Sequence, residues 1–470
     1  MKKFFLISSI LLFLSCSSDL EELNVDQKNA TFAPPEAFFN LAVKNLSDLL
    51  SGIEYGATVN PWSNSRLLVQ QISSVTYNEG TTYYLSFNWS SVYQDVLINL
   101  QQSKKVIETS EASSSPESKN KLAILEIMQV YTYGRLVETF GNIPYSEALD
   151  INIIIPKYDD AEIIYIDLLN RLSTAINNLD ESQASWNQDI LYAGDVGSWK
   201  KFGKSLQLQM GMRIVDSNLQ LATETIVEAI PGVFTTNEDN AKLVHLSAPP
   251  NTAELWTDLA VGNRKDYVGA EPFVNLLNEL EDPRRSVYFK PENGEYIGSP
   301  SGLVVSYDDF SKYGEIFYQP TTPTIFMDYA SVEFFLAEAA ERNIGSVTDS
   351  EAHYNAAITA SFEYYGLGDS IEAYLAQIEV AYTTAEGTWQ QKIATQKWLA
   401  LFNQSPEGYT EWRRMDYPTL IAPPDSFIDT VPVRFRYPIS EQTLNSANYE
   451  SAASAIGGDV MTTKLFWDVN

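Results

Sequence analysis

The chain has a single cysteine, Cys16, among its 470 residues, and this limits what can hold so long a fold together. A disulfide needs two cysteines, and one thiol alone makes a poor zinc site. The fold must therefore rest on its apolar core, for which 44% hydrophobic and 12% aromatic residues are sufficient. The thiol needs another explanation, and its place near the N-terminus indicates one.

The residues before Cys16 have the order of a secretory signal. Lys2 and Lys3 supply positive charge, residues 4–14 are apolar, and the small Ser15 precedes the cysteine. The apolar stretch is too short to span a bilayer, and no later run reaches about 18 apolar residues. We therefore predict a signal peptide over residues 1–15 and no transmembrane helix in the mature chain.

A cysteine directly after such a segment resembles the bacterial lipobox, in which the thiol is acylated, with Phe13 where leucine is usual. We predict that acylated Cys16 anchors the protein to a lipid bilayer, the alternative being a free thiol after an ordinary signal peptide. The serine and acidic residues at 17–22 resemble the signal that sends some Gram-negative lipoproteins to the outer face of the outer membrane. A solvated leader is the other interpretation. Residues 16–32 would then form a flexible tether.

The charge of the chain excludes several classes of partner. Asp and Glu number 61 against 31 Lys and Arg, a net charge of −30. Such a surface repels nucleic acid and anionic headgroups. His245 and His353 are the only histidines, which excludes a three-histidine zinc site and weakens any proposal of histidine acid-base catalysis. The sequence predicts no metal and no cofactor.

Apolar residues at helical spacing predict a mostly α-helical chain. Ser115 is the expected N-cap of a long helix beginning at Pro116. Other helices are expected over 35–50, 222–230, 271–280, 329–342 and 390–403.

Finer signals mark three further helices. Asp159 with Glu162, and Thr348 with Glu351, have the spacing of capping boxes. The segment "SWKKFGKSLQLQMGMRIVD" carries an apolar stripe four residues apart, formed by Phe202, Leu206, Met210 and Ile214.

Long loops separate these helices, at 55–66, 231–270, 290–325 and 404–450. Helical pairs suggest a helical-repeat scaffold, although no clean 34-residue consensus is present. Compact domains seldom contain connections this long unless the loops bind something. No linker interrupts the chain after residue 32, so we predict one domain over residues 33–470.

Catalytic signatures are scarce. The chain lacks HExxH, P-loop, GxGxxG, EF-hand and GxSxG motifs. Ser198 and Lys201 satisfy S-x-x-K, but we interpret Ser198 as a helix cap. The acidic residues Glu333, Glu338 and Glu341 share one expected helix, where packing or solvation is favoured over glycosidic catalysis. We predict a protein that is not an enzyme.

Aromatic residues in loops give the strongest functional signal. Flat rings beside amide, carboxylate and guanidinium groups suit a sugar, whose C–H face stacks on a ring while its hydroxyls bond at the edge. Core packing beneath long loops is the alternative for each ring, and we assign Trp199, Trp398 and Trp467 to the core. The candidate ligand-binding residues are Trp62 in "NPWSNSR", Tyr83, Tyr84 and Trp89 in "TTYYLSFNWSSVY", and Trp256, Arg264 and Tyr267 in "ELWTDLAVGNRKDYVG".

Several segments together resemble the SusD/RagB family of surface lipoproteins, in the family's order and over nearly the whole mature chain. They are "LVETFGNIPYSEAL" (136–149), "GDVGSWKKFGKSLQLQMGMR" (194–213), "LEDPRRSVYF" (280–289), "EFFLAEAA" (333–340), "QQKIATQKWLALFNQSPEGYTEWRRMDYP" (390–418), "VRFRYPISEQTLN" (433–445) and "GGDVMTTKLFWD" (457–468).

This resemblance implies a mostly α-helical fold of tetratricopeptide-like helix pairs, with the ligand site in loops on the opposite side. It also implies a partner, a SusC-like TonB-dependent transporter that the lipoprotein covers as a hinged lid. The matching motifs are largely architectural: turns at 141–144 and 282–284, and Arg413 and Arg414 holding loops by bidentate pairing. Ligand residues vary within the family, so none is transferred by position.

The leading hypothesis is a surface lipoprotein that captures glycans and passes them to the transporter. A peptide or small metabolite is the alternative cargo. Few basic residues in the loops argue against highly charged anionic glycans, although Arg66, Arg264 and Lys265 could serve a uronate. A surface glycoside hydrolase and a purely structural transporter subunit are the remaining alternatives.

Overall fold

A computed structural model describes residues 33–53 and 62–470. The predicted signal peptide, Cys16 and the tether over 16–32 lie outside the described residues. So does most of the loop expected over 55–66.

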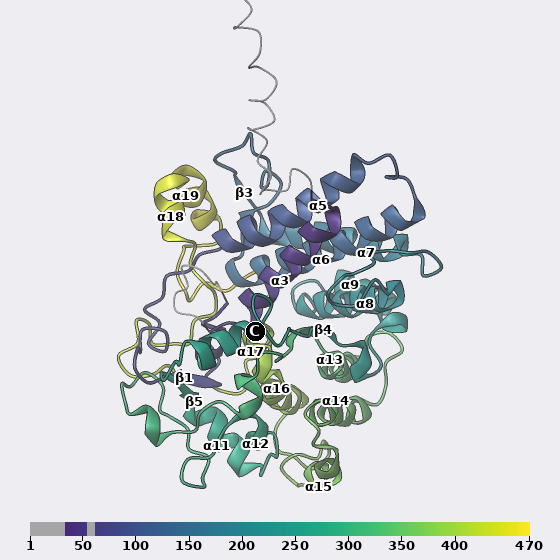
Figure 1. Cartoon of the computed structure of the whole chain (residues 1–470). Helices are drawn as coiled ribbons and strands as arrows, with labels where there is room; N and C mark the ends of the chain where they lie inside the picture. The colour runs from purple at the N-terminus through teal and green to yellow at the C-terminus, as the bar shows by residue number, and fades with distance from the viewer. Residues whose placement is uncertain (1–32, 54–61) are drawn as a thin grey trace, which may run out of the picture.

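Helix pairs form the scaffold. Each pair joins long helices that follow one another along the chain. Figure 1 shows the later pairs stacked down one side of the molecule while β1, β5 and long connections occupy the other. The pairs are α3 (Pro35–Ser51) with α5 (Ile98–Glu108), α6 (Pro116–Phe140) with α7 (Ala161–Asn178), α8 (Val196–Arg213) with α9 (Leu219–Ala229), and α13 (Tyr329–Glu341) with α14 (Ser350–Tyr364).

The remaining elements are short, apart from two helices that close the scaffold, α16 (Trp389–Ala400) and α17 (Ser405–Met415). The small helices are α4 (Ser65–Leu68), α10 (Glu254–Trp256), α11 (Glu271–Glu279), α12 (Arg285–Tyr288), α15 (Ile371–Leu375), α18 (Ile439–Leu444) and α19 (Ser446–Ala455). The antiparallel two-stranded sheets are β1 (Ile72–Ser74) with β5 (Tyr267–Gly269), β2 (Ile143–Pro144) with β3 (Tyr158–Asp159), and β4 (Ala241–Leu243) with β6 (Thr324–Met327).

The helix caps agree with the sequence in one case and differ in three. Ser115 caps α6, accepting a hydrogen bond from the Ser118 amide. The caps of α7 and α14 are Asp160 and Asp349, each one residue after the predicted cap. Ser198 lies inside α8 and is not its cap, because the Asp195 carboxylate already accepts from the Ser198 amide at 2.8 Å. An aspartate caps as well as serine or threonine, so residue type alone did not select the position.

The predicted core assignments are confirmed for the stripe of α8. Phe202, Leu206, Met210 and Ile214 are all buried. The expected loop over 404–450 is wrong at both ends, because α17 begins at Ser405 and the small helices α18 and α19 begin at Ile439 and Ser446. The buried face of α17 carries charged side chains, so the apolar periodicity that predicts a helix is missing there.

A cluster of buried ion pairs joins the scaffold helices and explains that face. We call it the buried ionic cluster. Four cations meet four carboxylates, so the charges balance. The members are Arg135 and Glu138 of α6, Arg213 of α8, Glu338 of α13, Lys397 of α16, and Glu407, Glu411 and Arg414 of α17.

The pairing sets the ionisation of the cluster. Burial alone would raise the pKa of Glu407, but the positive charges of Arg213 and Arg135 outweigh it and lower the pKa to about 2. Arg414 makes the bidentate pair expected of it, yet with Glu338 of α13 and not with a loop. Arg413 does hold a loop, by donating to the Val433 carbonyl at 3.0 Å.

His245 makes stability depend on pH. It is buried, its Nε2 lies 2.9 Å from the Thr324 hydroxyl, and burial followed by the charge of Lys44 lowers its pKa to about 4. The unfolded chain, with a histidine pKa near 6.5, binds the proton more tightly. Stability from this residue is therefore fully present above pH 6.5 and is lost as the pH falls toward 4.

We expect the melting temperature of the wild type to fall more steeply between pH 7 and pH 4.5 than that of His245→Gln. Thermal unfolding followed by circular dichroism across this range checks the difference. The carboxylates titrate equally in both proteins and cancel. Parallel curves would contradict the prediction.

Candidate functional site

Four of the seven candidate ligand residues are buried. Trp62 is 2% exposed and its indole donates to the Thr139 hydroxyl at 2.9 Å. Tyr267 lies in β5 and donates to the Ile53 carbonyl at 3.1 Å. The others are Tyr83 and Trp89. The prediction that these side chains offer a face to a ligand does not agree with their burial, because neighbouring residues already cover their rings.

Trp89 illustrates the packing. Its ring lies 5.0 Å from that of Phe140, 5.7 Å from that of Tyr158 and 5.8 Å from that of Tyr437, measured between centroids. The expected core positions of Trp199, Trp398 and Trp467 are confirmed by their burial.

The three other candidates keep exposed surface. Trp256 is half-buried at the end of α10. Arg264 is half-buried and holds Asp266, with Nε 3.0 Å from Oδ1, and these hydrogen bonds raise its pKa. Tyr84 is 57% exposed. Of these, Tyr84 is the ring most open to a ligand.

Three chain segments converge around Tyr84. The Phe427 amide donates to the Thr82 carbonyl at 2.8 Å, and the Asn78 side chain donates to the Gly302 carbonyl at 2.9 Å. Gly302 has a positive φ of 85°, and a Cβ there would lie 2.6 Å from Pro423. Glycine is therefore needed both for the turn and for the close approach of the second and third segments.

Tyr84 and Phe427 form an exposed aromatic pair. Their ring centroids are 5.3 Å apart at an interplanar angle of 69°, and Phe427 is 49% exposed. The guanidinium carbon of Arg436 lies 5.4 Å from the Phe427 ring centre. We call Tyr84, Phe427 and Arg436 the loop-face aromatic patch. Exposed apolar residues on the same three segments are Tyr77, Leu303, Val304 and Ile421.

The loop-face aromatic patch can hold a flat, partly apolar ligand. Two rings set at a steep angle offer a face and an edge, and the guanidinium offers hydrogen-bond donors beside them. Sequence analysis identified Tyr84 but missed Phe427 and Arg436. The signal available was the aromatic residue of "PPDSFIDT" within the expected 404–450 loop.

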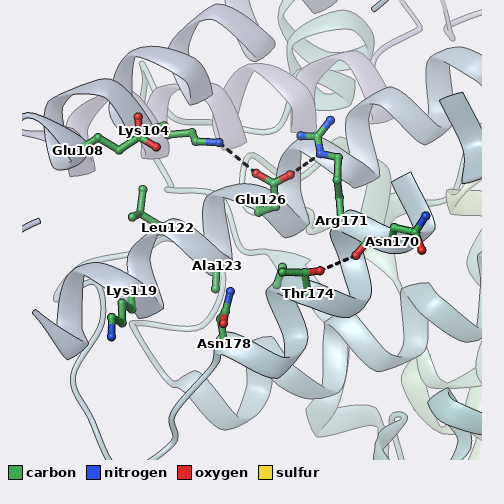
Figure 2. A pocket seen from close by; sticks show the side chains of 11 residues that line it. Lys104, Glu108, Lys119, Leu122, Ala123, Glu126, Asn170, Arg171, Thr174 and Asn178 are labelled. Carbon is green, nitrogen blue, oxygen red and sulfur yellow. Dashed lines mark hydrogen bonds and ion pairs between the residues drawn. The ribbon is translucent and has the colours of Figure 1, made fainter. Parts of the chain in front are cut away.

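A groove on the helical side offers a different chemistry. Figure 2 shows it between α5, α6 and α7, with a volume of about 540 Å³. Glu126 lies between Lys104, whose Nζ is 3.5 Å away, and Arg171, which donates to the same carboxylate. None of the residues that line this groove carries a ring. Three cations and two carboxylates line it, so it offers charge without a ring and suits a sugar less well than the aromatic patch does.

The described residues hold neither a metal-binding cluster nor a helix that could span a membrane. Across 33–53 and 62–470, no three His, Cys, Asp or Glu side chains come together as a metal site. Within the same residues, no helix has the length and apolar character needed to cross a bilayer.

Comparison with known proteins identifies the family of this chain. Residues 33–438 match the SusD-like family described as "Starch-binding associating with outer membrane". The chain belongs to the SusD-like family. No curated protein matches it by sequence.

Solved structures agree with this assignment. A chitin-binding SusD homolog from Flavobacterium johnsoniae has 25% identity and a TM-score of 0.79, covering 93% of this chain and 99% of the other. A second chitin-binding protein has 26% identity and the same TM-score, covering 93% and 100%. A SusD homolog from Bacteroides fragilis, at 23% identity, TM-score 0.78 and coverage of 93% and 99%, shows the fold alone.

Family membership confirms the resemblance and the mostly helical SusD-like fold read from the sequence. SusD-like proteins are non-catalytic binding proteins associated with the outer membrane, so the prediction of a protein that is not an enzyme is confirmed as well.

Proposed function

We propose that this SusD-like protein captures glycans on the loop-face aromatic patch and delivers them to a SusC-like TonB-dependent transporter. The observation that carries the proposal is the exposed Tyr84–Phe427 pair, which three separate chain segments assemble. Two structurally similar proteins are described as chitin-binding, which supports a glycan as the cargo.

The proposal includes the predicted location. Acylated Cys16 would hold the domain on the outer membrane, facing the cell exterior, and residues 16–32 would let it move over the transporter. Seventeen tether residues reach at most about 60 Å when fully extended, which is ample for a lid. Trp256 and Arg264 remain proposed as secondary contacts.

Affinity gel electrophoresis of a soluble form, residues 20–470, tests the capture. Gels containing starch or other neutral and acidic polysaccharides should retard the wild type in at least one case. Tyr84→Ala and Phe427→Ala should each weaken that retardation about tenfold, since an aromatic stack contributes roughly 0.5–1.5 kcal/mol beyond the area it buries. Leu219→Ala, an exposed position on α9, is the control and should bind as the wild type does.

Two outcomes would count against the proposal. Full retardation of both patch variants would move the site elsewhere on the molecule. Binding of peptides in place of every glycan, with the same loss on Tyr84→Ala, would assign the patch to the alternative cargo.

A further inference from the structure

A small cavity opens beside the loop-face aromatic patch. It has a volume of about 240 Å³, and the residues that directly follow Tyr84 in the sequence form part of its wall. Sites that enclose a whole ligand usually measure roughly 300–1,000 Å³, so this one suits a single residue of a longer glycan. The residues that line it are Leu85, Ser86, Phe87, Arg436, Tyr437, Ile439, Gln442, Tyr449 and Asp459.

Arg436 belongs to both the patch and the cavity. Its Nη2 donates to the Leu85 carbonyl at 3.0 Å, and its guanidinium lies over the Phe427 ring. Within the described residues no carboxylate lies within 4 Å of it. Its positive charge is therefore not neutralised by a direct ion pair.

The carboxylate that lines the cavity, that of Asp459, already has its own partners. Asp459 accepts hydrogen bonds from Arg434 at 2.9 Å, from the Tyr437 amide at 3.0 Å and from the Tyr449 hydroxyl at 3.2 Å. Its ion pair with Arg434 cancels its charge. The net charge available to a ligand is therefore the positive charge of Arg436.

Tyr437 supplies a second observation. It is 1% exposed, and its hydroxyl has no hydrogen-bond partner among the described residues. A buried hydroxyl left without a partner costs free energy, and native structures rarely keep one without a reason. A ligand oxygen in the cavity would satisfy it.

The two arginines that the sequence suggested for a uronate are engaged elsewhere. Arg66 is buried and donates to the Ser51 carbonyl at 2.7 Å, while Arg264 is paired with Asp266. Arg436 takes their place. Guanidinium is the group best shaped to bind a planar carboxylate with two parallel hydrogen bonds.

We propose that the cavity beside the patch binds the carboxylate of a uronic-acid residue, so that the cargo is a glycan carrying uronates. This inference rests on the proposed function, since the patch holds the neighbouring sugar rings. Arg436 binds the carboxylate and Tyr437 bonds one further oxygen of the same residue.

Matched ligands test the charge requirement. Oligogalacturonides, alginate oligosaccharides and glucuronoxylan are each compared with the same material after its carboxyl groups are reduced to alcohols. Isothermal titration of residues 20–470 should show binding of at least one uronate glycan and a loss of tenfold or more on carboxyl reduction. Equal affinity for a glycan and its reduced form would overturn the inference.

Matched variants test the residues. Arg436→Gln should lose tenfold or more in affinity for the uronate glycan, and Arg436→Lys should retain part of it, because a lysine keeps the charge but not the fork geometry. Tyr437→Phe should weaken binding without lowering the melting temperature. Lys200→Gln, an exposed charge on α8, makes the same change in net charge and should bind as the wild type does.

The outcomes separate this inference from the proposed function. Binding of neutral and acidic glycans alike, lost on Tyr84→Ala but unchanged in Arg436→Gln, would overturn the uronate site and leave glycan capture standing. Binding of oligo-glutamate through Arg436, with no uronate bound, would overturn the ligand class. Absence of binding to every glycan would overturn both.

Discussion

Replacing Arg213 by methionine should lower the free energy of unfolding by about 3–5 kcal/mol, the usual cost of removing one partner from a buried ion pair. The guanidinium is fully buried and contacts three carboxylates. Its Nε lies 3.2 Å from Glu138, its Nη2 lies 3.0 Å from Glu407, and its Nη1 donates to Glu411. Without it the buried ionic cluster holds three cations against four carboxylates.

Urea denaturation of the wild type and Arg213→Met measures the change. Lys200→Met removes an exposed cation from the same helix, where it pairs with Glu181 at the surface. Surface pairs contribute only about 0–1 kcal/mol, so this control should unfold close to the wild type. An equally small effect of Arg213→Met would show that the cluster is not a source of stability.

A double variant tests the reason for the loss. Adding Glu138→Gln to Arg213→Met removes one negative charge and restores the balance of the cluster. We expect the double variant to be more stable than Arg213→Met alone, which is the sign of direct coupling between the two residues. Additive losses would assign the effect to packing and not to charge.

Replacing Trp89 by alanine should destabilise the fold by about 3–5 kcal/mol, the range for truncating a large buried aromatic residue. The substitution leaves a cavity among the rings of Phe140, Tyr158 and Tyr437. Tyr84→Ala is the matched comparison only five residues away. It removes a ring that is 57% exposed and should change stability by less than about 1 kcal/mol.

The two variants should therefore separate stability from binding. Thermal unfolding should report a large loss for Trp89→Ala and little for Tyr84→Ala, while glycan retardation should report the loss for Tyr84→Ala. A melting temperature unchanged in Trp89→Ala would contradict the core position of this ring. Trp89 would then again be a candidate for binding the ligand.

The sequence predicted most of the scaffold helices, although not α5, because helices are encoded by local spacing. The α8 stripe and the Ser115 cap agree with the structure, since a period of 3.6 residues and a capping side chain act within one turn or two. Helix α17 was missed because its buried face has no such local pattern. Its buried face pairs Glu407, Glu411 and Arg414 with charges on other helices, and no local pattern shows such partners.

The sequence by itself determined that the chain has no disulfide framework, that it is mostly helical, and that it belongs with the SusD-like proteins. Only the tertiary structure decided which aromatic residues face solvent. Trp89 and Tyr84 come from the same stretch of sequence, yet one is buried and the other exposed. Exposure depends on what packs above a ring, and here Tyr84 meets Phe427 from a segment more than 300 residues away.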